Sequence, residues 1–127
     1  MIAKFTKINI VDNSGAKLAS CIHIYSGYKK RCATIGEKIL ISIKKLRSKR
    51  KSNSKVKKGE IYSALIVQTK KAITQKNGIK RNYLFNSAIL LNKQNKPLGS
   101  KIFIGLQSTF RHTKHLKILF IAPGIIH

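Results

Sequence analysis

Apolar and polar residues alternate with a period of two in several short segments of this chain. In Lys38–Lys44, for example, Ile39, Ile41 and Ile43 fall on one face, as a half-buried β-strand requires. The same alternation, bounded by turn residues, predicts further strands at Lys7–Val11, Lys17–Tyr25, Ile61–Thr69 and Tyr83–Leu91. Because five short strands are enough to close a small barrel, we expect a mainly β fold, namely a five-stranded closed β-barrel.

The segment between the last two of these strands predicts a hairpin. Asn77 and Gly78 form a two-residue turn signal, since both residue types tolerate the positive φ angles of tight hairpin turns. Lysine and arginine residues flank the turn on both arms. We therefore expect a basic β-ribbon, over about Lys70–Arg81, that projects from the barrel.

The pattern changes after Pro97. Ile102–Ile104 predicts a short strand, Thr109–Leu116 one or two helical turns, and Lys117–Ile121 a further strand. The length of 127 residues fits one domain, so residues 1–127 are expected to form a single unit. Residues 1–92 would make the barrel and its ribbon, and residues 93–127, the C-terminal extension, would pack on the barrel.

The aromatic residues fall into two groups. Four phenylalanines lie within apolar strand patterns and are expected in the core: Phe5, Phe85, Phe103 and Phe120. Tyr28 instead precedes a basic cluster, and two roles are open for it. It could stack on an unpaired base, as aromatic residues of RNA-binding proteins do, or it could pack against the end of the barrel.

The charge of the chain is strongly one-sided. Against 27 lysines and arginines stand only Asp12, Glu37 and Glu60, which leaves a formal net charge of +24. Most basic groups must therefore find their negative partner outside the protein, and nucleic acid or an anionic membrane surface could supply it. No apolar run approaches the roughly 18 residues of a transmembrane helix, so we expect a polyanion such as RNA and no membrane.

The basic residues gather in connections and at strand ends. Lys44–Lys58 is so rich in charge that we expect a loop ordered by its partner. Binding would proceed through phosphate neutralisation and release of counterions. The residues expected to contact RNA are Lys29, Lys30, Arg31, Lys44, Lys45, Arg47, Lys49, Arg50, Lys51, Lys55, Lys57, Lys58, Lys70, Lys71, Lys76, Lys80, Arg81, Arg111 and Lys114.

Catalytic and metal chemistry find little support in the sequence. Three isolated acids provide no carboxylate pair and no catalytic triad, so we expect no enzyme, no catalytic residue and no small-molecule substrate. His112 and His115 could share a helical face, but a zinc site needs further ligands. Cys21 and Cys32 lack the spacing of a zinc site or a disulfide framework, so no metal and no cofactor is expected.

Two other functions remain open at this point. A free-standing single-stranded nucleic-acid-binding β-barrel would carry aromatic residues on an exposed sheet face, whereas this chain concentrates lysine in its loops. A cationic membrane-active protein would need an amphipathic helix with a basic face. The sequence has strand periodicity where that helix would be.

Motifs that match one known family are spread along the chain at preserved spacings. They are Val11–Ala16, Cys21 with Ile22, Lys55–Glu60, Ala64–Val67, Thr69–Lys71, Asn77 with Gly78, Tyr83, Asn86, Ile89–Asn92, Pro97–Gly99, Lys101–Phe103, Arg111, Lys117 with Ile118, and Ala122 with Pro123. Across essentially the whole chain they resemble the universal large-subunit ribosomal protein numbered fourteen, in its bacterial and organellar type. The chain departs from the family pattern at Leu46–Ser54, which is longer and richer in lysine, and at Ile104 and Gly105, where the family usually has Gly-Pro.

The resemblance implies a structural constituent of the large ribosomal subunit. Its expected partners are large-subunit rRNA, the ribosomal proteins numbered three and nineteen, and small-subunit rRNA at intersubunit bridges. Acidic positions of the bacterial pattern are Thr109, Thr113 and Gly124 here, so salt bridges to neighbouring proteins are not carried over at these places.

The composition also bears on the compartment. Isoleucine, lysine and asparagine are abundant, and all three are read from A/T-rich codons. The N-terminus enters a strand pattern directly, without the signature of a targeting segment. Together with the bacterial-type motifs, this predicts an organelle-encoded protein of the mitochondrial matrix ribosome, with a plastid or the cytoplasm of a reduced bacterium as alternatives.

Overall fold

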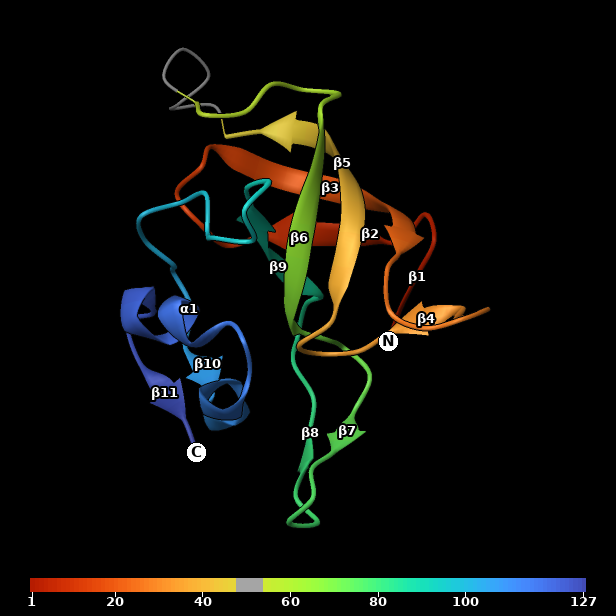
Figure 1. Cartoon of the computed structure of the whole chain (residues 1–127), viewed down its shortest axis with the longest axis vertical. Coiled ribbons are helices and arrows are strands. Elements are labelled where there is room, and N and C mark those ends of the chain that lie inside the picture. The colour runs from red at the N-terminus through yellow and green to blue at the C-terminus, as the bar shows by residue number, and fades with distance from the viewer. Residues whose placement is uncertain (48–53) are drawn as a thin grey trace.

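The computed structural model describes residues 1–47 and 54–127 of the chain. Its centre is a closed barrel with the strand order β2-β3-β5-β6-β9 (Figure 1). Neighbouring strands run antiparallel, except that β2 and β9 close the barrel in parallel. The five-stranded barrel predicted from the alternation is confirmed, and its strands are β2 (Lys7–Ile10), β3 (Ala16–Ile24), β5 (Lys38–Leu46), β6 (Ile61–Gln68) and β9 (Ser87–Leu91).

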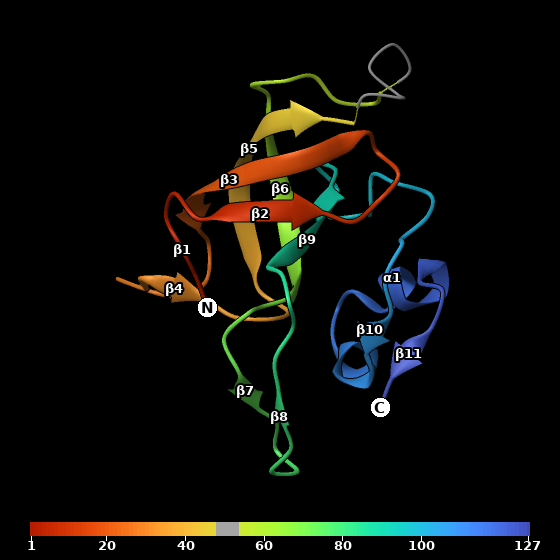
Figure 2. The same ribbon diagram turned by 180° about the vertical axis from the view of Figure 1, so that it is seen from behind.

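Shorter elements surround the barrel. β1 (Ile2–Ala3) pairs with β4 (Cys32–Ala33) beside the N-terminus. β7 (Ile73–Thr74) and β8 (Lys80–Arg81) pair to form the predicted ribbon, which projects from one end of the barrel in both views (Figures 1 and 2). In the described part of the chain, no helix is both long and apolar enough to cross a membrane.

The C-terminal extension lies beside the barrel and the ribbon (Figures 1 and 2). It contains a 3₁₀ helix, η2 (Ser108–His112), and one short α-helix, α1 (Leu116–Ile121). Two short strands, β10 (Leu106–Gln107) and β11 (Ile125–Ile126), pair in parallel. The extension thus has little regular structure of its own, and its stability depends on what it packs against.

The barrel interior forms the first of two hydrophobic cores. Alternate residues of each strand point inward, for example Ile39, Ile41 and Ile43 of β5, all of which are fully buried. Ile66 of β6 and Leu90 of β9 complete the same cluster. We call this cluster the barrel core. It needs no residue of the extension beyond Leu98, which packs at its edge.

The second core lies on the outside of β6 and β9. Leu65, Val67, Ile89 and Leu91 alternate with the inward-facing residues and are equally buried. The extension covers them with Phe110, which is 1% exposed, and with residues of α1 and β10. Burial on both faces explains the continuous apolar runs Ala64–Val67 and Ala88–Leu91 within these two strands. We call this cluster the second core.

The turn between β2 and β3 joins the barrel to the extension. Asp12 is fully buried, and its carboxylate accepts hydrogen bonds from the backbone and hydroxyl of Ser14 and from the backbone N–H of Leu90. Asn13 contacts the Ser100 hydroxyl and the Lys101 backbone N–H. Part of the motif Val11–Ala16 therefore has a structural function, because it satisfies buried polar groups.

The C-terminal prediction is wrong in two places. Lys117–Ile121 is not a strand, since it belongs to α1, and Ile102–Ile104 is reduced to a single β-bridge between Ile102 and Asp12. The helical turns predicted for Thr109–Leu116 are present, but they belong to η2 and to the start of α1. Short apolar runs do not distinguish a strand from one face of a short helix.

The four phenylalanines expected in the core lie largely outside it. Phe5 is 85% exposed, Phe120 80%, Phe85 61% and Phe103 48%. Phe110, which no strand pattern marked, is the phenylalanine that is buried. Alternation shows which residues share a face, but only tertiary packing decides whether anything covers that face.

The predicted loop Lys44–Lys58 begins later than expected. Lys44 and Lys45 are exposed residues of β5, which continues to Leu46. Val56 is buried in the barrel core, so the end of the segment is anchored by packing. The predicted RNA contacts Lys49, Arg50 and Lys51 lie outside the described residues.

Candidate nucleic-acid interface

Each of the three acidic residues is used inside the fold. Asp12 is enclosed in its buried turn, as described above. Glu37 accepts a hydrogen bond of 2.8 Å from the backbone N–H of Thr34 and forms an ion pair with Lys30. Burial alone would raise the pKa of Glu37, but the hydrogen bonds from Lys30 and Thr34 outweigh it and lower the pKa.

Glu60 closes the turn that leads into β6. Its carboxylate accepts hydrogen bonds from the Tyr62 hydroxyl, at 2.7 Å, and from the backbone N–H of Lys57, at 2.9 Å. These bonds lower the pKa of Glu60. Burial and the carboxylate together raise the pKa of Tyr62 to about 12.

Among residues 1–47 and 54–127, Lys30 and Glu37 form the one side-chain ion pair. The remaining basic groups of these residues therefore have no ion-pair partner within the protein.

The first basic cluster lies in the connection between β3 and β4. Lys29 and Arg31 are exposed, and the Lys29 ammonium lies 5.4 Å from the ring centroid of Tyr28. Tyr28 is 91% exposed. Of the two roles left open for Tyr28, packing against the barrel end is therefore not observed. Lys30 differs from its neighbours because Glu37 already neutralises it.

The second cluster surrounds the end of β5 and the turn before β6. Lys44, Lys45, Lys57 and Lys58 are exposed. The Lys55 ammonium donates a hydrogen bond of 3.3 Å to the backbone carbonyl of Leu98, which leaves two of its three N–H donors for other partners.

Arg47 is bound within the fold rather than free at the surface. Its guanidinium donates hydrogen bonds to the carbonyl of Ile10, at 3.0 Å, and to that of Ala16, at 3.4 Å. The same group lies over the ring of Phe103, 4.8 Å from the centroid. Arg47 thereby links β2, β3 and the extension, a function that residue type and spacing alone did not indicate.

The ribbon carries the third cluster. Lys70, Lys71, Lys76 and Lys80 are exposed along its two arms, while Arg81 is half-buried. The ribbon turn places Gly78 at φ +82°, a conformation that glycine adopts without strain. Because the turn projects from the barrel (Figure 1), these ammonium groups can reach an anion beyond the barrel surface.

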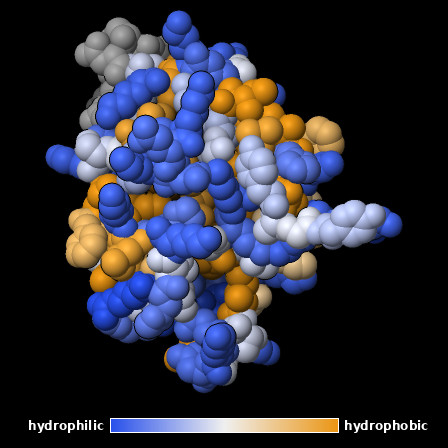
Figure 3. Space-filling view, in the orientation of Figure 1, coloured by the Kyte–Doolittle hydropathy of each residue, from blue (hydrophilic) through white to orange (hydrophobic). Residues whose placement is uncertain are grey.

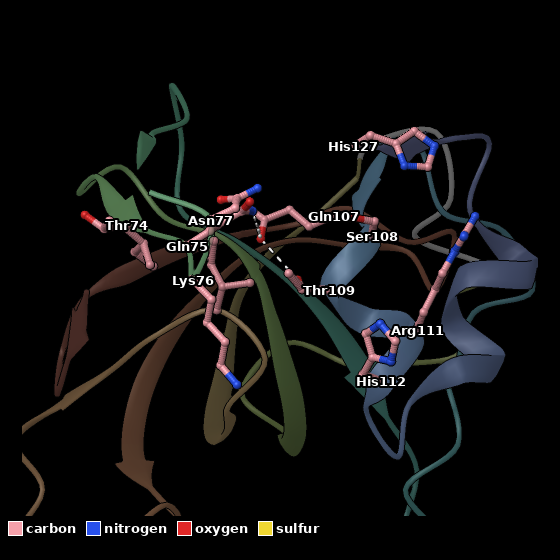
Figure 4. A pocket seen from close by; sticks show the side chains of 12 residues that line it. Thr74, Gln75, Lys76, Asn77, Gln107, Ser108, Thr109, Arg111, His112 and His127 are labelled. Carbon is pink, nitrogen blue, oxygen red and sulfur yellow. Dashed lines mark hydrogen bonds between the residues drawn. The ribbon is translucent and has the colours of Figure 1, made fainter. Parts of the chain in front are cut away.

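Arg111 of η2 and Lys114, both exposed, form the fourth cluster, and the structure brings the ribbon close to Arg111. A cleft of about 750 Å³ separates β7 and its turn from η2, and both Lys76 and Arg111 line it. Figure 4 shows Arg111 and His112 on the η2 side and Lys76 on the ribbon side. Gln107 crosses between them, accepting a hydrogen bond of 3.5 Å from Gln75. No acidic residue is among those that line this cleft.

Hydrophilic side chains spread over much of the face seen in Figure 3, and hydrophobic ones gather over the extension at its left and in a second group at its upper right. Exposed apolar residues of the extension include Phe120 and Leu116.

Among the described residues, no three histidine, cysteine or acidic side chains lie together as metal ligands would. Burial raises the pKa of the Cys21 thiol, which makes the reactive thiolate scarce.

A family model described as ribosomal protein L14p/L23e matches residues 1–126. The chain belongs to this family. It is therefore a structural protein of the large ribosomal subunit and not an enzyme. Membership of the L14p/L23e family also implies that it binds large-subunit rRNA and other ribosomal proteins.

The geometry of this L14p/L23e chain agrees with such a function. A rigid barrel uses its three acids for its own turns and leaves most of its lysines exposed. Lys38, Lys96 and Lys117 line a second pocket and were not among the predicted contacts. No local signal marked these residues, because they lie far apart in the sequence and meet only in the folded chain.

Proposed function

We propose that this protein holds large-subunit rRNA by phosphate neutralisation, through the exposed lysines of its four basic clusters. The observation that carries the proposal is the separation of charge within the fold. Asp12, Glu37 and Glu60 are all engaged in internal hydrogen bonds, whereas the lysines of the ribbon and of the connections are exposed. Folded RNA would supply the missing negative charge.

The clusters are not equivalent in this proposal. Lys30 and Arg47 already have partners inside the protein, so we expect less from them than from Lys29, Lys44 or Lys76. The cleft shared by Lys76 and Arg111 offers cationic groups from two separate elements. An RNA backbone that follows the cleft could contact the ribbon and the extension at once.

The surface also suggests which neighbouring ribosomal proteins and which further RNA the protein contacts. We infer that the apolar residues Leu116 and Phe120, exposed on α1, contact neighbouring ribosomal proteins, for which those numbered three and nineteen are the candidates. The basic surface would also contribute to intersubunit bridges with small-subunit rRNA. Exposed apolar side chains suit a protein neighbour, because burial against another apolar surface is favourable. A phosphate placed against them would lose its hydration without compensation.

We further propose that the protein acts in a mitochondrial ribosome. The abundance of isoleucine, lysine and asparagine supports an A/T-rich organelle genome, and the motifs are of the bacterial type. Fractionation would test this: the protein should sediment with ribosomes of the mitochondrial fraction, and recovery only from plastid or cytoplasmic ribosomes would contradict it.

The RNA proposal is tested by removing charge from the ribbon. A triple variant, Lys70→Gln, Lys76→Gln and Lys80→Gln, is compared with a triple of equal charge elsewhere, Lys4→Gln, Lys7→Gln and Lys17→Gln. Binding to large-subunit rRNA is measured across a range of salt concentrations. Each lost phosphate contact should reduce the slope of log affinity against log salt by about 0.7 to 0.9.

The ribbon triple should therefore reduce this slope by roughly two to three, and it should leave large subunits at a lower salt concentration during sedimentation. The control triple should behave much like the unaltered chain. Equal losses for both triples would mean that net charge alone matters and that the ribbon is not a contact. Binding to short single strands with no preference for ribosomal RNA would favour a free-standing single-strand binder.

A further inference from the structure

A second pocket lies between the turn at residues 92–97, the start of β5 and the start of α1. Its volume is about 520 Å³. Lys38 of β5, Lys96 of the turn, and Lys114 and Lys117 beside and within α1 line it, together with His115. These elements are distant in the sequence, so the pocket is a product of the way the extension docks on the barrel.

Backbone hydrogen bonds fix the turn that forms one wall. The Asn92 backbone N–H donates to the carbonyl of Lys96 at 2.8 Å, and that of Asn95 donates to the carbonyl of Asn92 at 3.0 Å. The Asn92 side chain also accepts from the backbone N–H groups of Gln94 and Lys96. A wall held in this way loses little entropy when it binds a ligand.

The opposite wall and the floor are also held in place. The His115 backbone N–H donates to the Thr113 hydroxyl at 3.3 Å, and its carbonyl accepts from Ile118 at 3.0 Å. Lys38 is half-buried, its ammonium hydrogen-bonds the Asn95 side-chain oxygen, and it lies 5.3 Å from the ring centroid of Tyr25. One donor is thus used, which leaves two N–H groups for a ligand.

The charges around this pocket all have the same sign. No residue that lines it is acidic, and four of its side chains are ammonium groups. Burial, followed by the charges of Lys38 and Lys114, lowers the pKa of His115. The charges of Lys38 and Lys114 add to the effect of burial, and a bound anion would relieve their repulsion.

We propose that this pocket binds a phosphate group, with Lys38 as the fixed donor and Lys96, Lys114 and Lys117 neutralising its charge. Ammonium groups bind phosphate as point charges without the planar geometry that arginine imposes, so a site built of lysines suits a tetrahedral anion. The phosphate could come from an RNA backbone or from a small polyphosphate. Lys38, Lys96 and Lys117 lie outside the four basic clusters proposed above, and Lys114 is shared with the fourth.

The test follows the histidine rings of the full-length chain by NMR. The chain has four histidines, so His23, His112 and His127 serve as internal references for His115. Titrations are run at constant ionic strength with no ligand, with inorganic pyrophosphate, and with a short oligouridylate. A bound phosphate should raise the apparent pKa of His115 more than that of the other three, since it cancels the repulsion from Lys38 and Lys114.

Variants show whether the phosphate binds in this pocket. Lys38→Gln should weaken binding by about tenfold, as loss of a charged hydrogen bond does, and Lys114→Gln should weaken it in the same direction. Lys7→Gln, on an exposed position of β2, removes the same charge far from the pocket and should change binding by no more than about twofold. The same spectra show whether each variant is folded.

The two ligands separate the sources of the phosphate. A response to pyrophosphate identifies a site for small polyphosphates, and a response to oligouridylate alone identifies an RNA backbone phosphate. Three results would overturn the proposal that this pocket binds phosphate. They are equal pKa shifts for all four histidines, no pKa shift at His115, and an unchanged response to the ligand in Lys38→Gln. Such a failure would leave the rRNA proposal intact, because the ribbon triple variant tests that proposal separately.

Discussion

The barrel and the C-terminal extension bury their apolar residues in different ways. Each barrel strand contributes alternate residues, such as Ile41, to a core that the strands enclose by themselves. The extension has no such core, and Phe110 and Leu119 are buried only because they pack on the outer face of β6 and β9. The barrel should therefore hold its structure without the extension, whereas the extension should depend on the barrel.

The same difference explains the misplaced phenylalanines. Phe110 and Phe120 lie ten residues apart in the extension, one on η2 and one on α1. Phe110 faces the outer side of the barrel and is 1% exposed, whereas Phe120 points away and is 80% exposed. The position of the barrel, and not the local pattern, decides which ring is buried.

The largest effect is expected from truncating the centre of the second core. Phe110→Ala should cost about 3–5 kcal/mol, as large-to-small changes of buried aromatic residues do. Hydrogen exchange should show early loss of protection in α1 and β11, while the amides of β3 and β5 stay protected. Phe120→Ala is the matched control, because its ring is already exposed and its loss should leave protection unchanged. Simultaneous loss throughout the chain would mean that the two cores unfold as one.

A change in the barrel core should destabilise both the barrel and the extension. Ile41→Ala removes a fully buried side chain from β5 and should cost about 2–5 kcal/mol. Here β3, β5 and α1 should lose protection together, because the extension cannot stay packed on an unfolded barrel. Ile61→Ala, at an exposed position of β6, provides the control. Protection that persists in α1 after the barrel has opened would reverse the proposed dependence.

A smaller effect is expected at the link between the two regions. Arg47→Met retains much of the aliphatic stem but removes the hydrogen bonds to Ile10 and Ala16 and the contact with Phe103. The expected cost is about 1–2 kcal/mol, measured by denaturant unfolding. Arg111→Met, on the exposed side of η2, should change stability by less than about 0.5 kcal/mol. Similar values for both variants would show that Arg47 is an ordinary surface residue.

The sequence predicted the barrel and the ribbon because their signals are local. Alternation in Lys38–Lys44 and the turn at Asn77 and Gly78 need no knowledge of the rest of the chain. The extension was harder to predict, since Lys117–Ile121 is an apolar run whose form depends on its docking surface. Its helix has six residues, which is too short to be stable alone.

The basic clusters were likewise predicted only as regions. Composition indicates that most lysines lack an internal partner, but it does not show which ones have one. Lys30 pairs with Glu37, and Arg47 binds backbone carbonyls. Conversely, Lys38 and Lys114 come from separate elements and were not grouped, because the pocket that joins them exists only in the folded chain.

The smallest expected effect is on the stability of the protein at acidic pH, and it should again distinguish the barrel from the extension. All three acidic residues lie before residue 93, so the extension has no acidic side chain. The folded state lowers the pKa of Glu37 below its ordinary value of 4.5. Its contribution to stability is therefore fully present above that value and is lost as the pH falls through the lowered pKa of the folded state.

Glu37→Gln should remove this part of the pH dependence, with a change of at most about 1 kcal/mol, because the ion pair with Lys30 is partly exposed. Thermal unfolding measured between neutral and acidic pH would show the difference between the variant and the unaltered chain. Lys30→Gln should reproduce part of it, since Glu37 would keep the hydrogen bond from Thr34 but lose the ammonium. If Glu37→Gln retained the full acid sensitivity, the loss of stability in acid would have to come from Glu60, whose carboxylate fixes the turn into β6 and whose pKa is also lowered in the folded state.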